Sequence, residues 1–287
     1  KPKKYSGTYG TNGFYLDFKN ATSTTTIGYD VSGNSTHFTA NNMSVTAGTN
    51  YDIFPDSPTP SSKVSDTGLG GQVIGNYCTW NNVDKTMSGT NNVFSNGGLT
   101  VSESTALGSD GRGTMMFTSG KWYFEGTVSG QIGGSHLIGI NIANERRNAY
   151  SGIYRSSGDT YSLANPAVVT SYAGYTSGDV IGVAFDVDNG KCWFRKNGTW
   201  LTGDPAAGTT PTFSFTAGTP IVPYYAFDNV SATKIWYTNF GQRTYTYSAP
   251  TGFKAMCTGN FPNPNVANPR KYHDTALIMA HTQIIVQ

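Results

Sequence analysis

Charged side chains are scarce in this sequence. Only 13% of its 287 residues are Asp, Glu, Lys or Arg, and the formal net charge is +2. The positive charges are scattered rather than arranged in a stripe, so they offer no footprint for a phosphate backbone. We therefore expect no nucleic-acid partner.

Helix-forming residues are also rare. Leu, Glu and Lys are few, whereas Gly, Thr, Ser, Asn, Tyr and Phe, which favour strands and turns, are abundant. No segment has the pattern of an amphipathic helix, and no apolar run approaches the length that spans a membrane. The composition predicts an all-β protein without membrane insertion.

Paired cysteines and clustered histidines are missing as well. The three cysteines have no Cys-x-x-Cys spacing, so neither a disulfide framework nor a zinc site is indicated, and we expect reduced thiols in or near a core. The histidines lie far apart. These residues are Cys78, Cys192, Cys257, His37, His136, His273 and His281. We expect no metal and no cofactor.

One short acidic motif has two interpretations. Asp186, Asp188 and Asn189 resemble the start of a calcium loop, but such a loop needs Glu at its twelfth position, where Asn197 stands. A hairpin turn explains the same residues, because Asn189 followed by Gly190 supplies the two positive φ angles of a type I′ turn. We predict the hairpin and keep calcium as the second interpretation.

The strongest strand signal lies in residues 178–201. A run of branched apolar residues reaches position 186, and an aromatic strand returns over 191–196 to a second Asn-Gly pair at 197–198. Two such turns on either side of one strand predict a β-hairpin. Further strands are predicted at 119–128, 137–142, 221–227 and 234–239. Trp122, Trp193 and Trp236 lie within these strand patterns and are expected in the core.

The flanks predict additional pieces. Residues 13–18 and 24–29 alternate apolar with polar side chains, which is typical of half-buried strands, and the Pro-rich and Ser-rich stretch 56–62 reads as a connector. We predict a β-rich N-terminal segment at 1–60, a sandwich at 61–253 and a C-terminal extension or linker at 254–287. Because the first residue is Lys1 rather than Met, we expect the chain to begin inside a longer parent.

Catalytic signatures are weak. A glycosidase needs two carboxylates that face each other across a sugar, and no spacing pairs any two of the candidates Glu103, Glu125, Asp159, Asp204 and Asp228. No Gly-x-Ser-x-Gly motif is present for a serine hydrolase. We expect no enzyme and no catalytic residue.

Three separated motifs carry a family resemblance. The run Gly178 to Leu201, with Gly120-Lys121-Trp122-Tyr123-Phe124-Glu125 upstream and Tyr237-Thr238-Asn239-Phe240-Gly241-Gln242 downstream, resembles the SPRY (B30.2-like) domain. The resemblance implies two antiparallel sheets and a non-catalytic binding module whose end loops contact a partner.

The flanks carry a second resemblance. Lys3 to Phe18, Tyr29 to Asn34 and Phe38 to Asn42 are similar to a segment that precedes SPRY domains in tailed-phage structural proteins. Gly252 to Cys257, with Phe261-Pro262-Asn263-Pro264 and Tyr272 to Thr275, are similar to the segment that follows, which usually leads into a concanavalin-like lectin sandwich. The predicted fold class is an all-β, two-sheet antiparallel SPRY/concanavalin-like β-sandwich with β-rich N- and C-terminal extensions.

The resemblance implies a non-enzymatic recognition module of a bacteriophage virion, in a tail fibre, spike or capsid fibre outside the cell. Its partners would be a host cell-surface glycan or protein and other virion proteins. A homo-oligomer is expected, a trimer being common among viral fibres, although no heptad run is present. The alternatives are a scaffold or decoration subunit that contacts only other virion proteins, and a carbohydrate-active hydrolase.

Aromatic and basic residues in or beside expected loops form the predicted contact surface, since Tyr and Trp suit both sugar stacking and protein interfaces. The alternative is that they are ordinary loop residues. The predicted binding residues are Arg146, Arg147, Tyr150, Tyr154, Arg155, Tyr172, Tyr175, Asn197, Trp200 and Asp204.

Overall fold

The structure is a computed structural model that describes most of the chain. The described residues are 5–20, 22–43, 65–73, 75–85, 92–104, 108–130, 136–143, 151–161, 169–228 and 232–261. In these ranges, no helix is long and apolar enough to cross a membrane.

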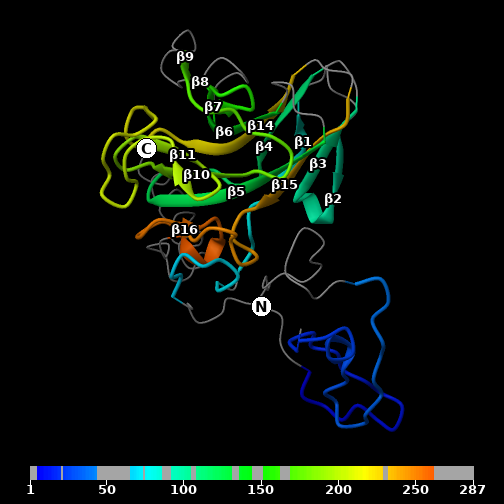
Figure 1. Cartoon of the computed structure of the whole chain (residues 1–287). Coiled ribbons are helices and arrows are strands. Elements are labelled where there is room, and N and C mark those ends of the chain that lie inside the picture. The colour runs from blue at the N-terminus through cyan, green and yellow to red at the C-terminus, as the bar shows by residue number, and fades with distance from the viewer. Residues whose placement is uncertain are drawn as a thin grey trace, which may run out of the picture.

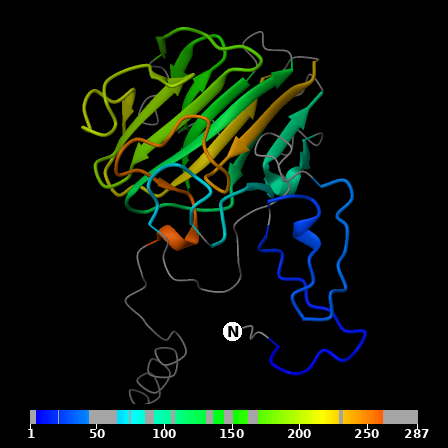
Figure 2. The same cartoon turned by 60° about the horizontal axis from the view of Figure 1, so that its bottom comes forward.

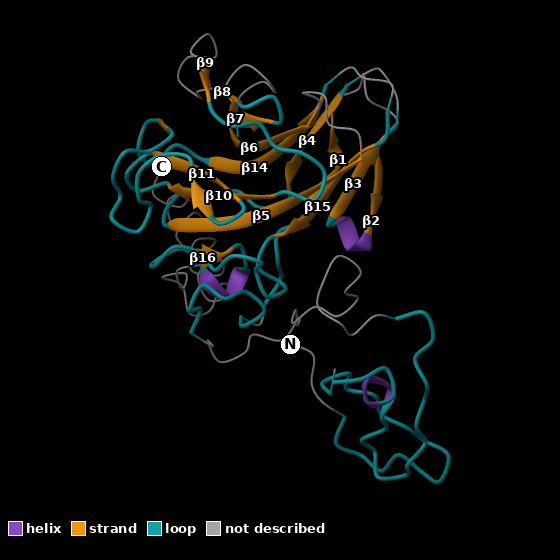
Figure 3. Ribbon diagram, viewed as in Figure 1, coloured by secondary structure: helices purple, strands orange, loops and turns teal. Residues whose placement is uncertain are grey.

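Almost all regular structure in the described residues is β-strand (Figure 3). The strands are β1 (Trp80–Lys85), β2 (Val93–Ser95), β3 (Thr100–Glu103), β4 (Ser109–Gly113), β5 (Lys121–Gly130), β6 (His136–Ile142), β7 (Ser151–Arg155), β8 (Asp159–Tyr161), β9 (Val169–Ser171), β10 (Val180–Asp186), β11 (Lys191–Lys196), β12 (Thr199–Trp200), β13 (Phe213–Ser214), β14 (Ile221–Phe227), β15 (Lys234–Asn239) and β16 (Lys254–Ala255). The 3-10 helices are η1 (Thr26–Gly28), η2 (Asn96–Gly98) and η3 (Thr258–Asn260).

The strands form two sheets that stack face to face (Figure 1). The seven-stranded sheet has the order β1-β4-β14-β6-β7-β8-β9, and the nine-stranded sheet has the order β12-β11-β10-β5-β15-β3-β2, with β13 beside β11 and β16 beside β5. Every pairing is antiparallel except that of β16 with β5. The predicted all-β, two-sheet antiparallel sandwich is therefore confirmed.

Aromatic side chains fill the space between the sheets. The ring of Trp80 packs edge-on against Tyr225 of the seven-stranded sheet, with centroids 4.9 Å apart. Trp122 and Trp236 of the nine-stranded sheet belong to the same buried cluster, as predicted. Burial of one such side chain is worth roughly 1.5 to 3 kcal/mol, so this layer dominates the stability of the sandwich.

The predicted hairpin joins β10 to β11, but its turn differs from the expected type. Asp186 pairs with Lys191, which leaves a four-residue loop, and only Gly190 in that loop has a positive φ, of 62°. The type I′ prediction for Asn189-Gly190 is therefore wrong. The carboxylate of Asp186 accepts hydrogen bonds from the backbone N of Asn189 at 3.1 Å and from its Nδ2 at 2.8 Å, and these bonds hold the longer turn.

The second Asn-Gly pair forms the tight turn. Asn197 and Gly198 have φ angles of 47° and 85°, and they connect Lys196 of β11 directly to Thr199 of β12. Two positive φ angles are what a two-residue turn of type I′ requires, because they match the twist of the flanking strands. The turn predicted at the second Asn-Gly pair is therefore confirmed.

A third layer covers part of the outer face of the nine-stranded sheet. Tyr123 of β5 and Trp193 of β11 point outward, and both are buried against Tyr245 and Phe253. The hydroxyl of Tyr245 donates to the backbone oxygen of Tyr123 at 2.9 Å. Trp193 is therefore a buried residue, as predicted, although it packs outside the sandwich.

Segments that precede and follow the sandwich strands in the sequence bond to each other in the covering layer. The carboxylate of Asp66 accepts the backbone N–H of Ala255 at 2.7 Å, and Figure 2 shows the two segments together below the sheets. Beyond them, the ring of Phe261 packs against Trp122 at 5.3 Å. The packed unit reaches Phe261, so the boundary predicted after Phe253 falls within packed structure.

The described N-terminal stretch, residues 5–43, contains no strand. Leu16 and Asp30 form one isolated bridge, and η1 occupies part of the second predicted strand, so the strands predicted at 13–18 and 24–29 are wrong. The carboxylate of Asp30 instead organises a loop by accepting the backbone N–H of Tyr15 at 2.8 Å and of Ser32 at 2.8 Å. Burial opposes ionisation of Asp30, but these hydrogen bonds hold its pKa well below its usual value.

Candidate functional site

The segment Tyr172–Asp179 closes one end of the sandwich, and we call it the 172–179 end. It leaves the seven-stranded sheet after β9, where the backbone N of Tyr172 bonds the oxygen of Gly158 at 2.9 Å. It then reaches the nine-stranded sheet, where Lys196 Nζ donates to the oxygen of Gly174 at 2.7 Å. Thr176 and Ser177 are exposed at its tip.

The tight turn at Asn197 belongs to the same end. Its side-chain Nδ2 donates to Asp179 at 2.7 Å, and its Oδ1 accepts the backbone N of Val180 at 2.8 Å. Lys196 adds an ion pair to Asp179 at 3.1 Å. Burial alone would raise the pKa of Asp179, but the hydrogen bonds from Thr176 and Asn197 and the Lys196 ammonium lower it. The predicted residue Asn197 is therefore bonded to Asp179 of the segment that begins at Tyr172.

Two of the predicted contact residues are core residues. Tyr154 is 0% exposed and Tyr175 is 3% exposed, so their placement on a loop surface is wrong. Tyr154 lies within β7 rather than in a loop, and its ring packs on Tyr175 at 4.9 Å. The hydroxyl of Tyr175 donates to the backbone oxygen of His136 at 2.8 Å, which fixes it under the 172–179 end.

The remaining predicted residues that the structure describes each have a different partner. Arg155 lies at the end of β7, half-buried and 3.1 Å from Asp228. Trp200 covers the guanidinium of Arg195 at 4.9 Å, and Asp204 closes a small turn by a bridge to Thr209 at the side of the sandwich. Arg146, Arg147 and Tyr150 lie outside the described residues.

Each acidic residue considered for hydrolysis has a structural partner. Glu103 is paired with Lys234 at 3.5 Å, with both side chains fully enclosed. Asp159 accepts hydrogen bonds from the hydroxyls of Ser157 and Ser171. Glu125, Asp204 and Asp228 are likewise held by Arg195, the backbone N of Ala206 and Arg155. These carboxylates are used to hold the fold together.

The Glu125 carboxylate is the centre of a buried polar network on the outer face of β5. It accepts the backbone N–H groups of Thr246 and Tyr247 at 2.8 Å and 2.9 Å, the hydroxyl of Tyr123 at 2.7 Å, and the guanidinium of Arg195 at 3.3 Å. Burial raises the pKa of Glu125 although all of these partners oppose the rise. The network fastens the covering layer to the sheet.

His136 predicts a pH dependence. Burial lowers the pKa of this side chain from 6.5 to about 4, so the unfolded chain binds a proton between those values that the folded chain does not. The contribution of His136 to the free energy of unfolding is therefore fully present above about pH 6.5. It falls by about 3 kcal/mol as the pH drops to about 4. Urea unfolding measured across this range should show a shallower loss for His136→Phe than for the parent chain. Equal slopes for the two proteins would contradict the prediction.

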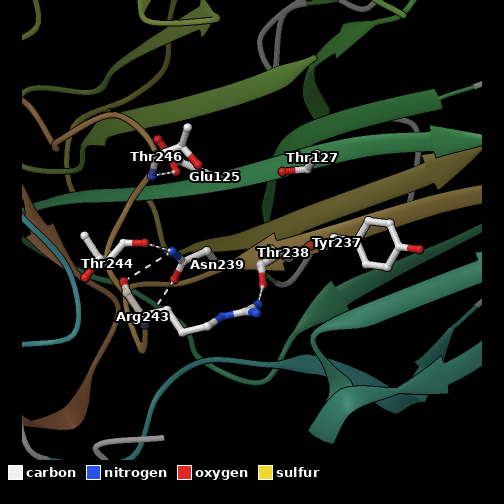
Figure 4. Close-up of a pocket in the computed structure, with 8 residues that line it drawn as sticks. All are labelled: Glu125, Thr127, Tyr237, Thr238, Asn239, Arg243, Thr244 and Thr246. Carbon is white, nitrogen blue, oxygen red and sulfur yellow. Dashed lines mark hydrogen bonds between the residues drawn. The ribbon is translucent and has the colours of Figure 1, made fainter. Parts of the chain in front are cut away.

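A hollow of about 110 Å³ opens on the outer face of the nine-stranded sheet, beside the covering layer. Figure 4 shows Tyr237 and Thr127 toward one side of it and Asn239, Thr244 and Thr246 toward the other. The lining residues are Glu125, Thr127, Tyr237, Thr238, Asn239, Arg243, Thr244 and Thr246. Sequence reasoning missed this site, because it searched the loops, whereas strand alternation places Glu125 and Thr127 of β5 and Tyr237 and Asn239 of β15 on the outer face.

These features define a β-sandwich domain with an exposed polar end and a polar hollow on one sheet. Residues 121–243 match the model of the SPRY domain family. Over these residues the chain is similar to the SPRY family, whose domains are typically protein-interaction modules.

Comparisons with individual proteins add little. The search of curated proteins finds no match. Among solved structures, the crystal structure of the SPRY domain of human HERC1 is similar, with a TM-score of 0.43 and 15% sequence identity, and the match covers 55% of this chain and 96% of that chain.

Proposed function

We propose that the chain is a non-enzymatic recognition module of a bacteriophage particle that binds a host cell-surface protein or glycan. The observation that carries the proposal is the match of residues 121–243 to the SPRY domain family, because domains of this family are typically protein-interaction modules. The flanking motifs resemble segments of tailed-phage structural proteins, and this resemblance supports a location on a virion. The loop surface we propose for the contact is the 172–179 end with Asn197.

The test introduces a large charged side chain at the tip of that end. Ser177→Arg should weaken binding of the purified chain to host bacteria by about tenfold, because Ser177 is exposed and an added guanidinium obstructs a fitted partner. The matched control is Thr216→Arg, an exposed position near the β10–β11 turn at the other end of the sandwich. Binding is measured on cells and by competition with phage adsorption.

A second candidate function is favoured by the N-terminal stretch. Its described part exposes large apolar side chains, and such patches mark contacts with other proteins. They are Tyr5, Phe14, Phe18, Tyr29, Val31, Phe38 and Met43. In this alternative the chain is a scaffold or decoration subunit of the particle. Absence of cell binding, together with association with other virion proteins, would favour this alternative over receptor binding.

A further inference from the structure

We propose that the hollow on the outer face of the nine-stranded sheet binds an uncharged sugar residue that stacks on the ring of Tyr237. This inference rests on the proposed function and deepens it, since it names a ligand class and a site separate from the 172–179 end. Three properties of the hollow support a sugar: a half-exposed aromatic ring, hydroxyls without partners among the described residues, and balanced charge.

The ring of Tyr237 is half-buried, so part of it is exposed to a ligand in the hollow. In β15 it stands opposite Thr127 of β5 and Thr100 of β3, so small side chains flank it on both neighbouring strands. Within the described part of the chain, Tyr237 makes no hydrogen bond through its side chain and no ring contact. An aromatic ring that is half-exposed and makes no contact with another ring is a surface on which the apolar face of a sugar ring can stack.

Free hydroxyls lie around that ring. The side chains of Thr127, Thr244 and Thr246 line the hollow, and none of them has a hydrogen-bond partner among the described residues. A hydroxyl both donates and accepts, so it matches the hydroxyl groups of a sugar, which do the same. Asn239 is different, because its amide is already bonded to the backbone oxygens of Arg243 and Thr244.

The charges of the hollow favour a neutral ligand. The carboxylate of Glu125 is 2% exposed and is balanced by Arg195. The guanidinium of Arg243 is 8% exposed and donates to the backbone oxygen of Thr238 at 3.2 Å. Neither sign of charge is presented to a ligand, whereas neutral hydroxyls are.

The experiment titrates the full chain with neutral monosaccharides and short oligosaccharides (glucose, galactose, mannose, N-acetylglucosamine) and with glucuronate, using saturation-transfer NMR and calorimetry. A neutral sugar should bind, and Tyr237→Ala should weaken it by about tenfold because the stacking face is lost. Tyr237→Phe keeps that face and should stay within about twofold. The matched control is Tyr161→Ala, which truncates a half-buried tyrosine on the other sheet.

Three results would overturn the inference: no sugar binds, only glucuronate binds, or Tyr237→Ala binds as well as the parent. Thermal unfolding of each variant shows that it is folded. Cell binding by Ser177→Arg and by Tyr237→Ala is measured in parallel, so that the two proposals fail separately. Cell binding without sugar binding rejects the sugar site in the hollow and leaves the proposed function standing. Sugar binding without cell binding supports the sugar site and contradicts the proposed function.

Discussion

Arg195→Leu is expected to cost about 3 to 5 kcal/mol of stability. The guanidinium of Arg195 is the cation that balances Glu125, and both side chains are almost completely enclosed. It also donates to the backbone oxygens of Tyr247 and Ser248, which lie in the covering layer. Its removal leaves a buried carboxylate without its counter-ion and two carbonyls without a donor, and each of these is costly in a medium of low dielectric.

The measurement is thermal unfolding, in which the midpoint should fall by roughly 6 to 20 °C. Arg155→Leu is the matched control: its partner Asp228 is 40% exposed, so its loss should cost about 1 kcal/mol or less. The double variant Glu125→Leu with Arg195→Leu should recover part of the lost stability, since it removes both buried charges. An Arg195→Leu midpoint within about 2 °C of the parent would show that the network does not fasten the covering layer.

The residues around this network show why only part of the structure could be predicted from the sequence. The hairpin of β10 and β11 follows from local chemistry, because an apolar branched strand and an aromatic strand are separated by turn residues. Nothing local indicates that the outward face of that hairpin is also buried. It is buried because Tyr245 and Phe253, about 50 or more residues downstream, return across it.

The errors have the same origin. Tyr175 reads as a loop residue because Gly and Ser surround it, yet its ring fills the end of the core and its hydroxyl reaches two backbone oxygens. Alternation in residues 13–18 predicts a strand, but a strand needs a partner, and Leu16 makes only an isolated bridge to Asp30. The hollow was missed because outward positions of β5 and β15 become neighbours only through the pairing of Glu125 with Asn239, and residues 243–246, which follow β15, complete its lining.

Trp236→Ala is expected to cost about 3 to 5 kcal/mol, because it empties the middle of the main core. Trp236 is 0% exposed. It stands between Val128 and Val101 on the neighbouring strands, and its ring packs on His136 at 5.7 Å. Two strands hold its backbone on either side, so the surrounding side chains can close the cavity only in part.

Trp236→Phe distinguishes the contribution of ring volume to stability from the contribution of the polar indole N–H. The indole Nε1 is buried without a hydrogen-bond partner, so the N–H contributes a desolvation cost that a phenyl ring lacks. The phenylalanine variant should therefore lose less than half of the stability that the alanine variant loses, as measured by urea unfolding. Equal losses would mean that the N–H is satisfied in solution by an enclosed water molecule. A loss below about 1 kcal/mol for Trp236→Ala would mean that the two sheets do not close over this ring.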